Sequence, residues 1–433
     1  MIIRIDRQGN VERDENPQVQ EDLISVDMGH SLAMEYTPAV PDEKSSVAVV
    51  IMHCDQNYMS LKMGPALAAH GYHVIAADSI IGGEIEKKFE LLNKYVKYLR
   101  SDASVKKIVL MGHSGGATLM TAYQAIAENG AAVFQGDNML YKTPLNTKLE
   151  SADGIMLIDA NYGNGVMSLL SLDPAVIEEG NGMKLDPKFD LFDPANGYDS
   201  NGAAYSPEFI RMYQTAQAKR NERLIEKALE RLEKIEKGEG CYADDEPFMI
   251  TAADQPKPNN RILPEDPRLL NHTKGEYDLL HGDGSITHEQ IHCVRVAEVD
   301  RCFSSTYGMG VNKNTVKGFL SSQAIRTTDG FAVTEDDVLG VDWDSSYASP
   351  IGNIQHITVP ALFMGLTGSY EFLAAEMIYN HAGRIRDKTI AFIHGANHMF
   401  APNRRAEKKP GEFGDTEKVL YGYMAGWLER FTF

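Results

Sequence analysis

The sequence predicts an α/β fold with a doubly wound, mostly parallel sheet and a large, partly helical insertion. Short apolar runs alternate with amphipathic segments over residues 47–162 and again over residues 351–433. Between them the chain is polar, irregular and rich in Pro, Asn and Asp, apart from one long helical pattern. Strands that alternate with helices are typical of a parallel sheet covered by helices on both faces.

The first flanking segment contains four expected strands. Each is a continuous apolar run, as in a strand buried on both faces of a parallel sheet. The strands are expected at residues 47–53, 72–77, 106–111 and 154–158, with helices at 61–70, 84–99 and 117–128. In the helix at 84–99, apolar residues recur at steps of three and four, which indicates one face packed on the sheet.

The insertion and the second flanking segment follow. One helix is expected at residues 207–237, with opposite charges three and four residues apart and one face in solvent. The strand–helix alternation then resumes, with strands at 359–364 and 389–393 and helices at 372–381 and 416–431. We therefore expect a core formed by residues 1–162 and 351–433, and a cap formed by residues 163–350.

Composition narrows the classes of partner. The 433 residues carry a formal net charge of −19, which disfavours nucleic acid and anionic membranes. No apolar stretch reaches the ~18 residues of a membrane span, and the N-terminus turns charged too early for a signal peptide. Four scattered cysteines suggest reduced thiols. We expect a soluble, cytoplasmic protein that acts on a small molecule, with its homo-oligomeric state left open.

The strongest chemical signal is the sequence Gly112-His-Ser114-Gly-Gly116, a G-x-S-x-G between an expected strand and an expected helix. Such a turn holds the serine in a strained backbone conformation with its hydroxyl exposed at the top of the sheet. Small residues on both sides let the chain turn tightly. Ser114 is therefore the candidate nucleophile.

A serine hydroxyl needs a base to remove its proton. His398 fits this role best among the 13 histidines, because it follows the last expected strand at the edge where α/β sheets bind ligands. His394 lies closer to the strand end and is expected to be packed. The backbone N–H of Gly115 can stabilise an oxyanion, and a second N–H is expected from Asp55, with Cys54 as the next candidate.

In this order of motifs the chain resembles the α/β-hydrolase superfamily. The resemblance covers the flanking segments and implies a Ser-His-acid triad, hydrolysis of an ester, lactone or related bond, and no cofactor. Cys54 stands where the family commonly has glycine, and the loop after residues 359–364 lacks the usual aspartate. Glu371 in that loop is the first choice for the acid. Asp159, at the end of an earlier strand, is the alternative.

A rival motif is His288-Glu-Gln-Ile-His292, the H-E-x-x-H pattern of zinc metalloproteases. Zinc binding by this pattern needs a helix, and the alternation that follows it favours a strand. We therefore expect no metal site there. A non-catalytic binding protein is disfavoured because both the serine and the histidine are present, whereas an acyltransferase or a carbon–carbon bond hydrolase would use the same triad. Aromatic and Met residues in the cap favour an apolar or aromatic substrate.

Overall fold

The structure is a computed structural model that describes residues 3–5, 11–13, 18–27, 31–253, 261–297 and 310–432. It is built around a ten-stranded sheet in the order β13-β12-β18-β17-β8-β7-β5-β6-β4-β3. These strands are β3 Val19–Ser25, β4 Leu32–Pro38, β5 Val47–Ile51, β6 His73–Ala77, β7 Lys107–Ser114, β8 Gly154–Ala160, β12 His272–Leu280, β13 Ile286–His292, β17 Ala361–Leu366 and β18 Lys388–Ile393. The run from β6 to β12 is parallel, and the two ends of the sheet are antiparallel.

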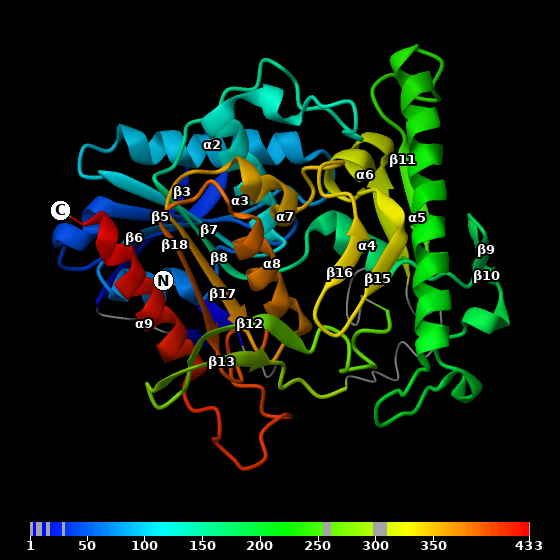
Figure 1. Cartoon of the computed structure of the whole chain (residues 1–433). Coiled ribbons are helices and arrows are strands. Elements are labelled where there is room, and N and C mark those ends of the chain that lie inside the picture. Colours follow the sequence, from blue (N-terminus) through cyan, green and yellow to red (C-terminus); the bar gives the residue numbers. More distant parts are fainter. Residues whose placement is uncertain are drawn as a thin grey trace.

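Helices cover both faces of this sheet (Figure 1). One face carries α1 (Met63–Ala69) and α9 (Thr416–Leu428). The other carries α2 Ile85–Ser101, α3 Gly116–Asn129 and α8 Leu373–His381. In β5, alternate residues join the two apolar clusters, because successive side chains of a strand point to opposite faces. The predicted doubly wound α/β fold is confirmed, with each strand and helix expected in the flanking segments present.

The expected cap region contributes to the sheet as well. Its hairpin β12–β13 lies beside β18, with Leu279 opposite Phe392 and Leu280 opposite Ile393. Residues 272–292 therefore extend the core sheet, which differs from the expectation that residues 163–350 form a cap alone. Periodicity in a single sequence does not show which distant strand a hairpin joins. The antiparallel pair β3–β4 at the opposite edge was likewise not expected.

The rest of the insertion forms small elements around one long helix. Figure 1 shows this helix, α5 (Pro207–Glu236), standing at the side of the molecule away from α9. The other helices are α4 Asn164–Ser171, α6 Val316–Ser322 and α7 Pro350–Asn353. Two-stranded sheets pair β9 Val176–Glu178 with β10 Asn181–Leu185, β11 Pro247–Thr251 with β14 Val311–Thr315, and β15 Thr327–Val333 with β16 Val338–Val341; β1 Ile3–Ile5 pairs with β2 Val11–Arg13.

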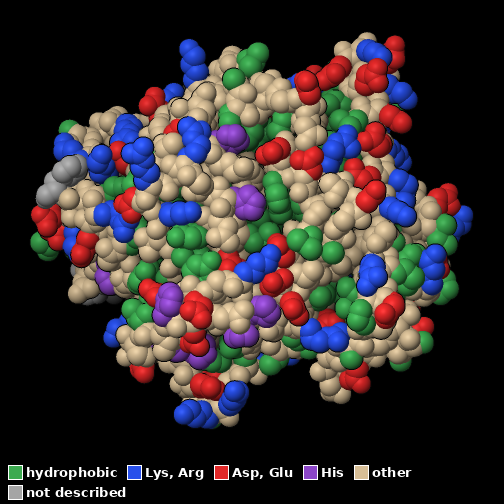
Figure 2. Space-filling model, in the orientation of Figure 1, with side chains coloured by type: hydrophobic (Ala, Val, Ile, Leu, Met, Phe, Trp, Pro, Cys, Tyr) green, Lys and Arg blue, Asp and Glu red, His purple; other side chains and the backbone are tan. Residues whose placement is uncertain are grey.

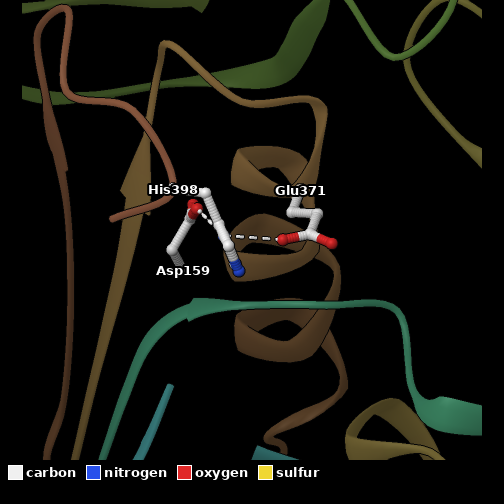
Figure 3. A group of neighbouring side chains, drawn as sticks. All are labelled: Asp159, Glu371 and His398. Atoms are coloured by element: carbon white, nitrogen blue, oxygen red, sulfur yellow. Dashed lines mark hydrogen bonds and ion pairs between the residues drawn. The ribbon is translucent and has the colours of Figure 1, made fainter. Parts of the chain in front are cut away.

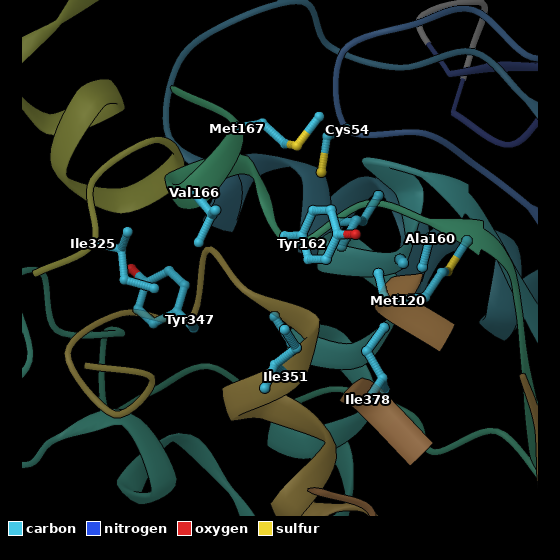
Figure 4. Close-up of a cluster of buried hydrophobic side chains, with 14 of the residues drawn as sticks. Cys54, Met120, Ala160, Tyr162, Val166, Met167, Ile325, Tyr347, Ile351 and Ile378 are labelled. Carbon is cyan, nitrogen blue, oxygen red and sulfur yellow. The ribbon is translucent and has the colours of Figure 1, made fainter. Parts of the chain in front are cut away.

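One continuous apolar cluster joins the insertion to the core. Figure 4 shows Met167 of α4 beside Cys54, and Ile325 beside Tyr347. All these side chains are buried. Burying apolar surface in this way stabilises the contact by about 25 cal/mol per Å². The insertion is thus packed on the helices of one sheet face. Among the described helices, none combines the length and the apolar character that crossing a membrane requires.

Arg220 of α5 lies fully buried, although the charge pattern predicted a helix with one solvent-facing side. Its guanidinium contacts Glu179 through two nitrogens, at 2.7 and 2.8 Å, and donates to the carbonyls of Asp173 and Thr251. A planar guanidinium can serve several acceptors at once, which is why Arg suits such a site.

We predict that Arg220→Leu destabilises the protein by about 3–5 kcal/mol, because it leaves the Glu179 carboxylate and buried carbonyls without donors. The exposed Arg223 of the same helix is the matched control, and Arg223→Leu is expected to change stability by less than about 0.5 kcal/mol. Chemical denaturation monitored by circular dichroism measures both. Equal denaturation midpoints for the two variants would contradict this account.

Candidate active site

Ser114 lies in a strained turn between β7 and α3. Its φ of 54° is in the left-handed region, which non-glycine residues seldom occupy. The neighbouring glycines make the turn possible: a Cβ at Gly112 would lie 2.7 Å from backbone atoms of Ala117, and one at Gly116 would lie 2.7 Å from the carbonyl oxygen of Met52. Backbone strain of this kind is typical of functional sites.

Asp159 is the extra residue of a β-bulge at the end of β8. In the pairing of β7 with β8, His113 faces Ile158 and Ser114 faces Ala160, so that Asp159 has no opposite residue. Its φ is 42°. A bulge re-aims a side chain at the end of a ladder, and here it directs the carboxylate toward His398. One carboxylate oxygen, Oδ1, accepts a hydrogen bond of 2.9 Å from the N–H of Leu366.

His398 follows β18 in a loop held by backbone hydrogen bonds. The N–H of Gly395 donates to Thr367 Oγ1, and the N–H of Asn397 donates to the carbonyl of Ala401. Nδ1 of His398 donates to Asp159 Oδ2 at 2.7 Å. The imidazole side chain is 32% exposed, whereas the Asp159 carboxylate is fully buried. One ring nitrogen is thus tied to the protein interior, and the other remains available for chemistry.

Glu371 contacts the same nitrogen from another side. Its Oε2 lies 2.7 Å from Nδ1 of His398, and Figure 3 shows the imidazole between the two carboxylates. Nδ1 carries one proton, which points at Asp159, and Glu371 Oε2 is buried without a hydrogen-bond donor. Glu371 therefore makes an ion pair with His398, and the orienting hydrogen bond goes to Asp159. The sequence favours Glu371 as the triad acid, with Asp159 as the alternative, whereas the geometry favours Asp159.

The two carboxylates change the protonation of His398. Burial alone would lower its pKa, but the charge of Glu371 and the hydrogen bond to Asp159 outweigh burial and raise the pKa to about 10. Burial raises the pKa of Asp159, and the bond to His398 opposes that shift. At neutral pH the imidazole is therefore mostly charged. Only its neutral form can accept a proton from a serine.

A second histidine, His113, supports the loop that carries His398. Its Nε2 lies 2.8 Å from the carbonyl oxygen of His398, and its Nδ1 lies 2.7 Å from the hydroxyl of Tyr58. A carbonyl oxygen only accepts, so that Nε2 carries the proton and Nδ1 accepts from Tyr58. Burial holds the pKa of His113 well below its usual value, which keeps the ring neutral. The two histidine rings also pack together, with centroids 4.5 Å apart.

The hydroxyl of Ser114 forms no hydrogen bond with His398 among the described residues. Catalytic hydrogen bonds are often long before substrate binds, and they tighten in the complex. Ser114 and His398 are nevertheless neighbours through His113, which directly precedes the serine and packs on the His398 ring.

Two backbone N–H groups near Ser114 can stabilise an oxyanion. Among the described residues, those of Gly115 and Cys54 donate to no acceptor. The buried thiol of Cys54 donates to the carbonyl of Gly115 at 3.0 Å, which ties the two segments together. Burial raises the pKa of this thiol to about 12, so that it stays protonated. A side chain at Gly115 would meet Asn164 Oδ1 at 2.8 Å, which explains the glycine.

The geometry does not support Asp55 as an oxyanion donor. Its backbone N–H donates to Nδ1 of His53 at 2.9 Å and is already used. Burial lowers the pKa of His53 to about 4, so that this ring is a neutral acceptor. The Asp55 side chain instead holds the loop in place through a 2.6 Å ion pair with the fully buried Lys88 of α2. Cys54, the second candidate, takes the position expected for Asp55.

Asp159, Glu371 and His398 also have the composition of a metal site, with one ligand atom from each lying within 4.8 Å of the others. Their place beside the strained Ser114 turn favours a catalytic triad. The H-E-x-x-H motif lies on β13, as the alternation predicted. In a strand, His288 and His292 are about 13 Å apart, too far to share one ion.

The order of the strands and the place of the site residues on them identify the fold. The nucleophile turn follows the central strand β7, and the histidine loop follows β18 near the sheet edge, with antiparallel β4 beside β6 at the other side. The chain has an α/β-hydrolase fold.

Comparisons with known proteins find solved structures of low similarity over most of the chain. The chain resembles the crystal structure of esterase B from Lactobacillus rhamnosis, with 8% identity, a TM-score of 0.39, and coverage of 95% of this chain and 88% of the other. It resembles proline iminopeptidase of Mycobacterium smegmatis with 12% identity, a TM-score of 0.36, and coverage of 95% and 98%. No protein-family model and no curated protein matches the chain. The fold assignment therefore rests on the strand order and the serine turn.

Sequence reasoning missed two residues of this site. His113 is visible in the motif as the variable position of G-x-S-x-G, and its role in holding the His398 loop depends on a contact 285 residues away. Tyr58 lies in a loop after β5 and gives no local signal at all. Polar residues that act through tertiary hydrogen bonds carry no periodic pattern, and only the folded chain identifies them.

We predict that kcat/KM rises with pH along a limb set by deprotonation of His398, and that this limb lies above the ordinary histidine range. Glu371→Gln removes one negative charge beside the imidazole and is expected to move the limb down by about 1–3 pH units. Rate profiles of an activated ester measure the shift. Glu417→Gln, a surface variant on α9, is the control, and an unmoved limb in Glu371→Gln would contradict the proposed charge effect.

Proposed function

We propose that this protein is a serine hydrolase that cleaves an ester, lactone or related acyl bond through an acyl-enzyme. The observation that carries the proposal is the 2.7 Å hydrogen bond from His398 Nδ1 to Asp159, made beside the strained Ser114 turn. In this proposal Ser114 is the nucleophile, His398 the general base and Asp159 the acid that orients it. Glu371 adds negative charge next to the imidazole.

The proposed reaction begins when the neutral His398 removes the hydroxyl proton of Ser114 at Nε2. Oγ attacks the substrate carbonyl carbon, and the N–H groups of Gly115 and Cys54 stabilise the oxygen that becomes negative. The protonated Nε2 then returns its proton to the leaving group as the C–O bond breaks. Water attacks the acyl-enzyme with His398 again as base, and the acid product leaves Ser114 free.

Asp159 stabilises the imidazolium that forms during each attack. Because its bulged backbone and the N–H of Leu366 fix the carboxylate, little rearrangement is needed when the charge appears. Glu371 strengthens the same charge but raises the pKa of the base, which favours turnover at alkaline pH. Asp159 therefore orients His398, and the charge of Glu371 shifts the pH range in which His398 acts as a base.

An apolar or aromatic substrate is part of this proposal. Apolar side chains border one side of the Cys54 segment, and Figure 4 shows Met167 and Tyr162 close to Cys54. They come from α4 and from the segment after β8, so that the insertion and the core both contribute. A side-chain set with these properties favours an acyl group without charge.

We predict that Ser114→Ala abolishes ester turnover and covalent labelling by a fluorophosphonate, because only a hydroxyl activated on this turn reacts. Circular dichroism and the denaturation midpoint of the variant are expected to match those of the unaltered protein. Ser60→Ala, at an exposed position in the loop before α1, is the matched control and keeps its label. Labelling of Ser114→Ala at the original rate would exclude the serine mechanism.

The choice of acid is tested by amide substitutions that keep side-chain shape. Asp159→Asn is expected to lower kcat by roughly 10⁴-fold, the scale seen when a triad acid loses its charge. Glu371→Gln is expected to keep kcat within about tenfold at its own pH optimum, because the hydrogen bond of His398 is unchanged. Steady-state rates at several pH values measure both, and the opposite ranking of the two variants would assign the triad acid to Glu371.

A further inference from the structure

One lysine of this acidic protein lies inside the fold. On the face that Figure 2 shows, Lys and Arg side chains lie at the surface and are mixed with Asp and Glu. The side chain of Lys88, in α2, is instead fully buried. Its ammonium makes one hydrogen bond among the described residues, of 2.6 Å to Oδ1 of Asp55. Because burying an ammonium group costs free energy, lysines are almost never fully buried unless they are paired. The contact with Asp55 therefore compensates the buried charge.

Asp55 belongs to the loop that carries the Cys54 N–H. Residues 52–57 of this loop form neither helix nor strand, so that the position of the loop depends on side-chain contacts. Oδ1 of Asp55 also accepts a hydrogen bond of 3.2 Å from the N–H of Gly82, in the loop before α2. The N–H of Asp55 donates to Nδ1 of His53. One carboxylate oxygen thus connects the loop after β5 to α2 and to the segment that precedes α2.

The other polar groups of Cys54 are held by the protein. Its thiol donates to the carbonyl of Gly115 at 3.0 Å, and its carbonyl accepts from the hydroxyl of Ser79 at 2.9 Å. Its N–H donates to no acceptor among the described residues. Donors that are fixed before the reaction stabilise an oxyanion well, because they need no rearrangement when the charge forms. The Cys54 N–H has this property only while the loop stays in place.

We propose that Lys88 is a positioning residue for the oxyanion site, an inference that rests on the proposed serine mechanism. Through Asp55 it holds the residue that directly follows Cys54, and so fixes the direction of the Cys54 N–H. Lys88 acts through the loop and not by contact with the substrate, since its side chain has no exposed surface.

The charge of Lys88 also acts on Cys54. Burial is the main cause that raises the pKa of the Cys54 thiol, and Lys88 opposes this increase more strongly than Asp55 adds to it. At Cys54 the ion pair therefore acts as a net positive charge. Such a charge attracts a negative oxygen that forms beside the Cys54 N–H, and the attraction is stronger in the protein interior than in water. Lys88 is thus expected to stabilise the charged intermediate more than the neutral ester.

Lys88→Met tests the proposal, because methionine has a side chain of similar length without the charge. We expect kcat for an activated ester to fall roughly 10- to 100-fold, with KM within about twofold of its original value. The exposed Lys87 of the same helix is the matched control, and Lys87→Met is expected to change neither constant. The pH limb of kcat/KM should stay in place in both variants, because burial, Glu371 and Asp159 together set the pKa of His398.

Inhibition by a trifluoromethyl ketone measures stabilisation of the oxyanion separately. Oγ of Ser114 adds to the carbonyl carbon of the ketone, the hydroxyl proton passes to His398, and the ketone oxygen becomes the negative oxygen of a hemiketal. In Lys88→Met, the inhibition constant is expected to increase by the same factor by which kcat/KM falls. Titration of active sites with a fluorophosphonate corrects both constants for any inactive protein.

The double variant Lys88→Met with Asp55→Asn provides the test if Lys88→Met does not fold. It leaves no unpaired ion in the interior, and its kcat is expected to fall by the same roughly 10- to 100-fold, because the two residues act as one pair. Unchanged kcat and ketone affinity in a folded variant would overturn the role of Lys88, while fluorophosphonate labelling of the unaltered chain would still support the serine mechanism. Absence of labelling in the unaltered chain would overturn both proposals.

Discussion

One proton, on Nδ1 of His398, organises this site. Two carboxylates lie 2.7 Å from that nitrogen, yet the proton can be directed at only one of them. It goes to Asp159, which a bulge and a backbone N–H hold in place, and Glu371 pairs with the ring by charge alone, without a hydrogen bond. The direction of Nδ1–H fixes the ring orientation, and the ring orientation decides where the base nitrogen points. The second carboxylate, Glu371, raises the pKa of His398 and so sets the pH at which the base becomes neutral.

Backbone strain gathers at this same place. Ser114, Asp159 and Phe400 all have φ in the left-handed region. Ser114 is the last residue of β7, Asp159 is the last but one of β8, and Phe400 lies two residues after His398. A residue in this conformation costs of order 1–3 kcal/mol in stability, so that contacts with the surrounding fold must hold it there. The close packing of Gly112 and Gly116 against neighbouring backbone supplies that constraint for Ser114. The strained backbone at the carboxyl ends of β7 and β8 therefore positions the side chains of the site and lowers the local stability of the fold.

Local patterns predicted much of this molecule. The strand ending at His53 and the turn at Ser114 could be predicted from local sequence. Buried strands and tight turns each have a characteristic pattern within a few residues. The sheet position of β12 and the role of Arg220 could not be predicted, since they depend on partners far along the chain. The acid was ambiguous for the same reason: Asp159 and Glu371 both follow strands, and only the bulge distinguishes them. Asp55 failed as an oxyanion donor because His53, two residues earlier, takes its N–H.

The most direct measurement is a crystal structure of the protein after reaction with a fluorophosphonate ester. The account predicts phosphorus bonded to Ser114 Oγ, the phosphoryl oxygen within hydrogen-bond distance of the N–H groups of Gly115 and Cys54, and Nδ1 of His398 still bonded to Asp159. A phosphonate on another residue, or an imidazole turned so that Nδ1 bonds Glu371 instead, would contradict it.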